Sequence, residues 1–85
     1  LKNRKKLTQE EKNEIAEIRK ETKAVIADKD VSLNYKIKKL VDRVSPERLD
    51  SEREILKKEI NDIKESLERE MEEKIEAIYI RINKS

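Results

Sequence analysis

The side chains best suited to chemistry in this sequence are basic, and they cluster near the middle of the chain. Lys36, Lys39 and Arg43 recur at helical spacing, so a helix would carry them on one outer face. Lysines and arginines on a helix whose other side is packed are suited to contacts with nucleic-acid phosphates. We therefore predict a phosphate-contacting face, although a merely solvated basic face would show the same pattern. The predicted contacts are Tyr35, Lys36, Lys38, Lys39 and Arg43.

A second basic group lies at the start of the sequence. Residues 1–6, LKNRKK, carry four positive charges and no hydrophobic periodicity, which predicts a frayed basic arm over residues 1–7. Residues 1–45 hold 13 Lys and Arg against 8 Asp and Glu, a balance of +5, whereas residues 46–85 hold 9 against 12, a balance of −3. Because a nucleic acid is a polyanion, we expect the arm to add contacts through Lys2, Arg4, Lys5 and Lys6.

Catalytic side chains are scarce. The sequence has no His, no Cys and no Gly, which removes imidazole bases, thiol nucleophiles, the usual zinc ligands and phosphate-binding glycine loops. Carboxylate pairs such as Glu10 with Glu11 and Glu72 with Glu73 are plentiful, but nothing in the pattern predicts an apolar pocket that would raise a pKa. We interpret them as solvated surface, and we predict no enzyme activity, no metal ion, no cofactor and no small-molecule substrate.

Two short segments resemble parts of a known enzyme family. AEIRK at residues 16–20 and SPERLDSERE at residues 45–54 are similar to segments of the all-helical chorismate mutases, which use Arg, Lys, Glu and Gln in a bundle of similar size. That family has a long first helix with further Arg and Lys ligands, whereas here a break is expected at residues 28–32. The resemblance implies a small helical enzyme, which we keep as a third alternative; Arg19 and Arg53 would then matter for turnover.

Another stretch resembles a DNA-binding motif. IADKDVSLNYKIKKLV, residues 26–41, is similar to a helix-turn-helix in its Ile-Ala pair, its Val-Ser turn and the spacing of its later apolar residues. The turn is one residue shorter than the usual form and lacks its Gly. The resemblance implies an autonomous, dimeric DNA-binding protein with the basic helix in the groove, and this is the second alternative.

Two helix starts are marked by capping signals. In TQEE, residues 8–11, the spacing predicts a capping box: the Thr8 hydroxyl accepts from the Glu11 N–H, and the Glu11 carboxylate accepts from the Thr8 N–H. Ser-Pro-Glu at residues 45–47 predicts a second start at Pro46, because proline loses no hydrogen bond in a first turn and glutamate favours the positive helix end.

Hydrophobic periodicity predicts three helices. Apolar residues recur at helical spacing over about residues 8–28 and again over 32–44, and DKDVS at 28–32 interrupts them. A third helix is predicted over about 46–83, where apolar residues recur every 3.7 residues or so, which disfavours a long heptad zipper. We predict an all-α, three-helix protein, in which two shorter helices pack on one long C-terminal helix in a single domain of residues 8–85.

The apolar stripe of the long helix continues to the end of the sequence. Helix 32–44 would cover only the first third of it and helix 8–28 could not cover the rest, so we expect the C-terminal half to protrude uncovered. Ile80 projects about 200° from Ile78 and needs a neighbour of its own. We predict that this tail binds another protein, either a larger host subunit or a second copy; an ordinary helix end and a strand added to a partner's sheet are the alternatives. The predicted contacts are Leu67, Met71, Ile75, Ile78, Tyr79, Ile80 and Ile82.

These patterns favour a small accessory subunit. We expect a non-catalytic adaptor that docks through its C-terminal helix on a larger nucleic-acid-processing complex, of the replication-polymerase or transcription type. No apolar run approaches the roughly 20 residues of a membrane span, and we expect a soluble, cytoplasmic protein. Glu and Lys number 15 each against one Gln, which is typical of proteins from heat-loving organisms and also of long solvated helices.

Overall fold

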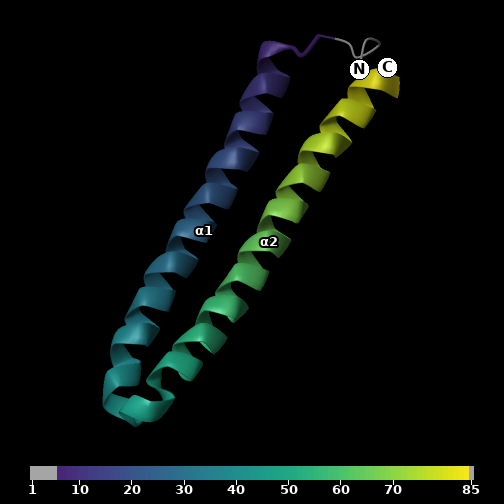
Figure 1. Ribbon diagram of the computed structural model, residues 1–85. Helices are drawn as coiled ribbons and strands as arrows, with labels where there is room; N and C mark the ends of the chain where they lie inside the picture. The colour runs from purple at the N-terminus through teal and green to yellow at the C-terminus, as the bar shows by residue number, and fades with distance from the viewer. Residues whose placement is uncertain (1–5, 85) are drawn as a thin grey trace.

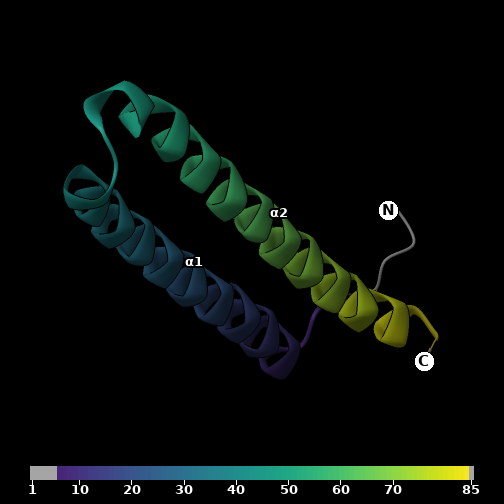
Figure 2. The same cartoon turned by 90° about the horizontal axis from the view of Figure 1, so that it is seen from below.

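The described part of the chain is an antiparallel hairpin of two long α-helices (Figure 1). The computed structural model describes residues 6–84, so most of the predicted basic arm lies outside the described residues. Helix α1 spans Gln9–Arg43 and helix α2 spans Pro46–Lys84. The hairpin measures 60 × 19 × 15 Å, and a view turned by 90° shows the same two helices side by side (Figure 2). The predicted all-α class is confirmed.

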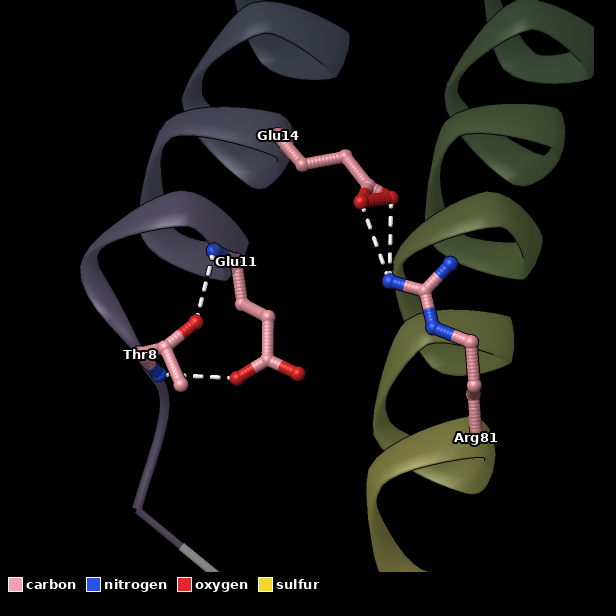
Figure 3. Close-up of polar contacts among 4 residues, drawn as sticks. All are labelled: Thr8, Glu11, Glu14 and Arg81. Atoms are coloured by element: carbon pink, nitrogen blue, oxygen red, sulfur yellow. Dashed lines mark hydrogen bonds and ion pairs between the residues drawn. The ribbon is translucent and has the colours of Figure 1, made fainter. Parts of the chain in front are cut away.

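Helix α1 begins at the predicted capping box. The Thr8 hydroxyl accepts a hydrogen bond from the Glu11 N–H at 3.1 Å, and the Thr8 N–H donates to Glu11 Oε1 at 2.7 Å (Figure 3). Lys12 N–H donates to the Thr8 carbonyl at 3.0 Å and starts the helical ladder. The two bonds between Thr8 and Glu11 serve backbone N–H groups that have no partner within the helix.

The predicted three-helix count is wrong, because α1 runs through residues 28–32 without a break. DKDVS contains neither Gly nor Pro, and its residues each cost less than about 0.7 kcal/mol relative to alanine in a helix. Packing against α2 outweighs so small a preference. Lys64 Nζ of α2 donates to Asp30 Oδ1 at 3.0 Å, which ties this segment to the opposite helix.

The two helices are joined by a short connection at the predicted position. Helix α1 ends at Arg43, and the extended backbone of Val44 still donates its N–H to the Leu40 carbonyl at 3.0 Å. The start of α2 at Pro46 is confirmed. A residue before proline avoids helical backbone angles, so the chain turns there and α2 returns along α1.

The core lies between the helices, and three of the four buried side chains among the described residues cluster at their open end. Ile15 of α1 is packed with Ile78 and Ile82 of α2, and these side chains are 8%, 4% and 7% exposed. Leu7, Ile18, Ile75 and Tyr79 pack around them. The expectation that the C-terminal half of the long helix is uncovered is therefore wrong. The reason is length: α1 has 35 residues, about 52 Å, and reaches nearly to the end of α2.

Two ion pairs between the helices show a constant register. Arg81 Nη2 donates to Glu14 Oε1 at 3.0 Å and Oε2 at 3.2 Å (Figure 3), and Lys64 pairs with Asp30. The paired residues are 16 positions apart on α1 and 17 on α2, so neither helix slips along the other between them. The expected short bundle is instead an extended hairpin. Neither helix, over its described residues, combines the length and apolar character of a membrane span.

Candidate functional site

The closed end of the hairpin carries a hollow lined by most of the predicted phosphate-contacting residues. It has a volume of about 290 Å³. Tyr35 is 61% exposed, and Lys39 Nζ lies 5.4 Å from the centre of its ring, within the range of a cation–π contact. Lys38 is exposed but does not line the hollow. The lining residues are Tyr35, Lys36, Lys39, Leu40 and Arg43 of α1 and Leu56 of α2.

The helix itself explains why cations gather at this place. The hollow lies at the C-terminal end of α1, where unpaired carbonyls give the helix a partial negative charge that favours Lys and Arg. Arg43 belongs to the last turn of α1. The half-buried Leu40 faces α2 and leaves the neighbouring basic side chains exposed to solvent. The arrangement suits a phosphate group, because the described residues that line it include three cationic side chains and no carboxylate.

The predicted basic arm does not join this hollow within the described residues. Lys6 is exposed at the open end of the hairpin, and α1 extends about 40 Å from Gln9 to Lys36. One phosphate group therefore cannot contact both Lys6 and the hollow. Lys2, Arg4 and Lys5 lie outside the described residues.

The seven predicted partner-binding residues divide by burial. Ile78 and Ile82 belong to the protein's own core, and Ile75 and Tyr79 pack against it. Ile80 is the one exposed residue of the seven, at 47%, and lies away from the core as predicted. The strand interpretation is wrong because Ile78, Ile80 and Ile82 all lie within α2. Docking was expected because these apolar side chains were predicted to be uncovered, and that reason does not apply to Ile78 and Ile82, which are buried against α1. A partner-binding role for the seven residues stays a prediction.

A second hollow was not predicted. It has a volume of about 140 Å³ and lies midway along the hairpin. Val25, 40% exposed, forms part of its wall with Leu67 and Met71, so two predicted partner-binding residues do reach the surface here. The periodicity of each helix places these residues, but the register that brings them together comes from tertiary packing. Its lining is Ile18, Glu21, Thr22, Val25, Leu67, Glu70, Met71 and Lys74.

The two family resemblances differ from the structure in specific ways. The helix-turn-helix interpretation is wrong in its main feature, because residues 26–41 form one continuous stretch of α1. Arg19 and Arg53, which the enzyme alternative requires, lie roughly 30 Å apart along the hairpin. Arg53 Nη1 is 3.3 Å from Asp50 Oδ1 of its own helix. Among the described residues no polar side chain is buried and no three acidic side chains converge on a metal position.

Two ionisable groups at the open end have shifted pKa values. The hydrogen bond from the Thr8 backbone lowers the pKa of Glu11 below its ordinary value of 4.5, and the Thr8 hydroxyl adds to the effect. The hydrogen bond to Glu14 raises the pKa of Arg81, and the charge of Glu14 acts in the same direction. Both shifts come from contacts in solvent that stabilise the charged forms. They belong to a helix cap and a salt bridge rather than to a catalytic acid or base.

Comparison of the chain with protein-family models, with curated proteins and with solved structures finds no match. The described residues form a helical hairpin with basic side chains around the hollow at its closed end.

Proposed function

We propose that this chain is a non-catalytic interaction module, an adaptor that docks on a larger nucleic-acid-processing complex. The observation that carries the proposal is the shape of the hairpin. Four side chains are buried among the described residues, Ile15, Ile60, Ile78 and Ile82, and all of them are apolar. A rod of this kind has no interior in which a substrate could be desolvated, but it offers two long helical faces to partners.

The nucleic-acid part of the proposal rests on the closed-end hollow. Lys36, Lys39 and Arg43 line one hollow, so their charges lie within reach of a single phosphate group or two adjacent ones. Tyr35 offers a largely exposed ring beside them for a base or a sugar. Such a small contact supports weak, sequence-independent binding, as expected of an adaptor that a larger host holds on nucleic acid.

Fluorescence anisotropy with labelled duplex DNA at increasing salt tests the phosphate contact. Lys36→Glu with Lys39→Glu should weaken binding and lower the salt slope by about 0.9 for each phosphate that the variant no longer neutralises. The matched control is Lys20→Glu with Lys23→Glu, which changes the same charge on exposed residues of the same helix far from the hollow. If both variants weaken binding equally, the effect comes from the overall charge and not from a contact at the hollow, and the proposed phosphate contact is wrong.

Reconstitution tests the adaptor itself. The immobilised chain should capture from its native lysate a protein of nucleic-acid metabolism that re-forms a complex of fixed stoichiometry when both are purified. Wild-type chain should bind bare duplex only weakly and release it at moderate salt. Tight, sequence-selective binding of duplex by the chain alone would contradict the adaptor proposal.

A further inference from the structure

One exposed face of α1 has a charge pattern that is complementary to itself. Its residues follow one another at steps of 4, 3, 4, 7, 4, 3 and 4, or 29 residues over about eight helical turns, so they form a single straight stripe. The stripe is acidic in the N-terminal half of α1, apolar at its centre and basic in the C-terminal half. We call it the α1 stripe: Glu14, Ile18, Glu21, Val25, Ser32, Lys36, Lys39 and Arg43.

The apolar centre of the stripe continues onto α2. Val25 and Ile63 are each 40% exposed, although both belong to the apolar pattern of their helices. Leu67 lines the midway hollow with Val25, and Ile63 precedes it by one helical turn. Ile18 lines one hollow and Lys36 lines the other. They are 18 residues apart, which is about five full helical turns, so both hollows lie on the same side of α1.

The charges at the two ends of the stripe are available. Within residues 6–84, Glu21, Lys36 and Arg43 form no ion pair with the rest of the hairpin. Glu14 shares its carboxylate with Arg81, and its side chain keeps 42% of its surface exposed. An incoming chain with the opposite charge pattern would therefore meet accessible partners at both ends.

The surface area of the chain is large enough to supply an interface. Its accessible surface is 7004 Å². A compact protein of 10.2 kDa exposes about 5300 Å², so the hairpin exposes about 1700 Å² more than a globular chain of its mass. A standard interface buries about 800 Å² on each partner. A second chain laid along one face could bury that area and leave an ordinary protein surface.

We propose that the α1 stripe pairs with the same stripe of a second copy, antiparallel, so that two hairpins stack face to face as a four-helix bundle. A two-fold axis near Val25 sets the alignment of the two copies. Each residue of one copy then faces the residue of the other copy for which the two residue numbers add up to 50. Lys36 thus meets Glu14 of the second copy, and Val25 meets Val25. Such an interface has an apolar centre and a charged rim, as protein interfaces commonly have.

This inference rests on the proposed interaction function and names one partner for it. The second copy would use the same lysines as the proposed phosphate contact, so a polyanion and a second copy compete there. Different experimental results would disprove the two proposals. A chain that is monomeric when purified without nucleic acid overturns the pairing, whereas the adaptor proposal depends on capture of a different protein.

Sedimentation equilibrium of the full chain gives the first test, with a dimer of twice 10.2 kDa expected. Val25→Glu should raise the dimer dissociation constant by on the order of 100-fold, because it places two like charges at the two-fold axis. The matched control is Val41→Glu, which is 63% exposed and points about 160° away from the stripe. A Val25→Glu dimer as tight as that of the control overturns the proposal.

Charge reversal tests the antiparallel pairing. Glu14→Lys places two lysines together at each proposed Glu14–Lys36 contact, and Lys36→Glu places two glutamates together there, so each variant alone should be monomeric. Mixing the two should restore a dimer that contains one of each. Circular dichroism checks that both variants stay helical. If either helical variant still forms a dimer alone, or if two helical variants fail to combine, the stripe is not the interface.

Discussion

Thr8 and Glu11 hold the first turn of α1 by exchanging hydrogen bonds, and neither residue contributes to the core. The first N–H groups of any helix have no carbonyl partner within the helix, so a side chain or water must accept from them. Here the two residues satisfy one another's backbone N–H groups. The cap also lies beside the Glu14–Arg81 pair, so the start of α1 is fixed both within the helix and to α2 (Figure 3).

Thr8→Ala should lower the free energy of unfolding by about 1 kcal/mol, because it removes the acceptor for the Glu11 N–H. Urea denaturation followed by circular dichroism measures the change. Ser51→Ala is the control, since Ser51 is exposed within α2 and alanine is the better helix former. An unchanged midpoint for Thr8→Ala would show that water replaces the cap without cost.

Acid should weaken the same cap. Because the pKa of Glu11 is lower in the folded protein than its ordinary value of 4.5, its charge stabilises the fold above that pH, and this contribution is lost as the pH falls below 4.5 through the folded value. The difference in melting temperature between wild type and Glu11→Gln should therefore be largest near neutral pH and shrink in acid. A difference that stays constant down to pH 3 would contradict the assignment.

At the scale of the element, the decisive feature is the continuity of α1 through residues 28–32. The sequence marks both helix starts clearly, because a capping box and a Ser-Pro pair act through local hydrogen bonds and fixed backbone angles. It marks the middle of α1 poorly. Asp, Lys, Val and Ser only mildly disfavour helix, and the packing partner that decides the outcome lies 34 residues away, at Lys64.

Val31→Pro tests this continuity. Val31 is 68% exposed, so its side chain contributes little packing, but proline would remove a hydrogen bond and clash with the preceding turn at a cost of about 3 kcal/mol or more. Val31→Ala is the control and should be close to neutral. A loss of helicity in the proline variant, seen by circular dichroism, supports one long helix; an unchanged spectrum would favour the loop predicted from the sequence.

In the candidate site, too, the sequence predicts the features that depend on one helix and misses those that depend on how the two helices pack together. Lys36, Lys39 and Arg43 were predicted to share a face because 3.6-residue periodicity alone places them there. Leu56 was missed as part of the hollow, since its contact with α1 depends on how the helices are aligned. The interpretation of the tail failed for the same reason: once 28–32 is helical, α1 reaches Ile78 and Ile82.

At the scale of the whole molecule, the hairpin depends on very few buried side chains. Ile78→Ser with Ile82→Ser should unfold it, because removing one large buried aliphatic side chain costs about 2–5 kcal/mol and small domains have only about 5–15 kcal/mol in total. Ile80→Ser is the control on the same helix, and its 47% exposure predicts a much smaller effect. Thermal melts distinguish the two. A folded double variant would mean that the open end contributes little to stability.

Because both helices have their free ends at the same end of the rod, pulling on the chain would peel it rather than shear it (Figures 1 and 2). Tension would reach the Glu14–Arg81 pair and the packed Ile15, Ile78 and Ile82 first, and only afterwards the contacts nearer the turn. The packed cluster of Ile15, Ile78 and Ile82 is therefore the first part of the core to bear the load, and it sets the force at which the helices begin to separate. In an optical trap, Ile82→Ala should lower the force at which extension begins. An unaltered force would show that this cluster does not resist the pull.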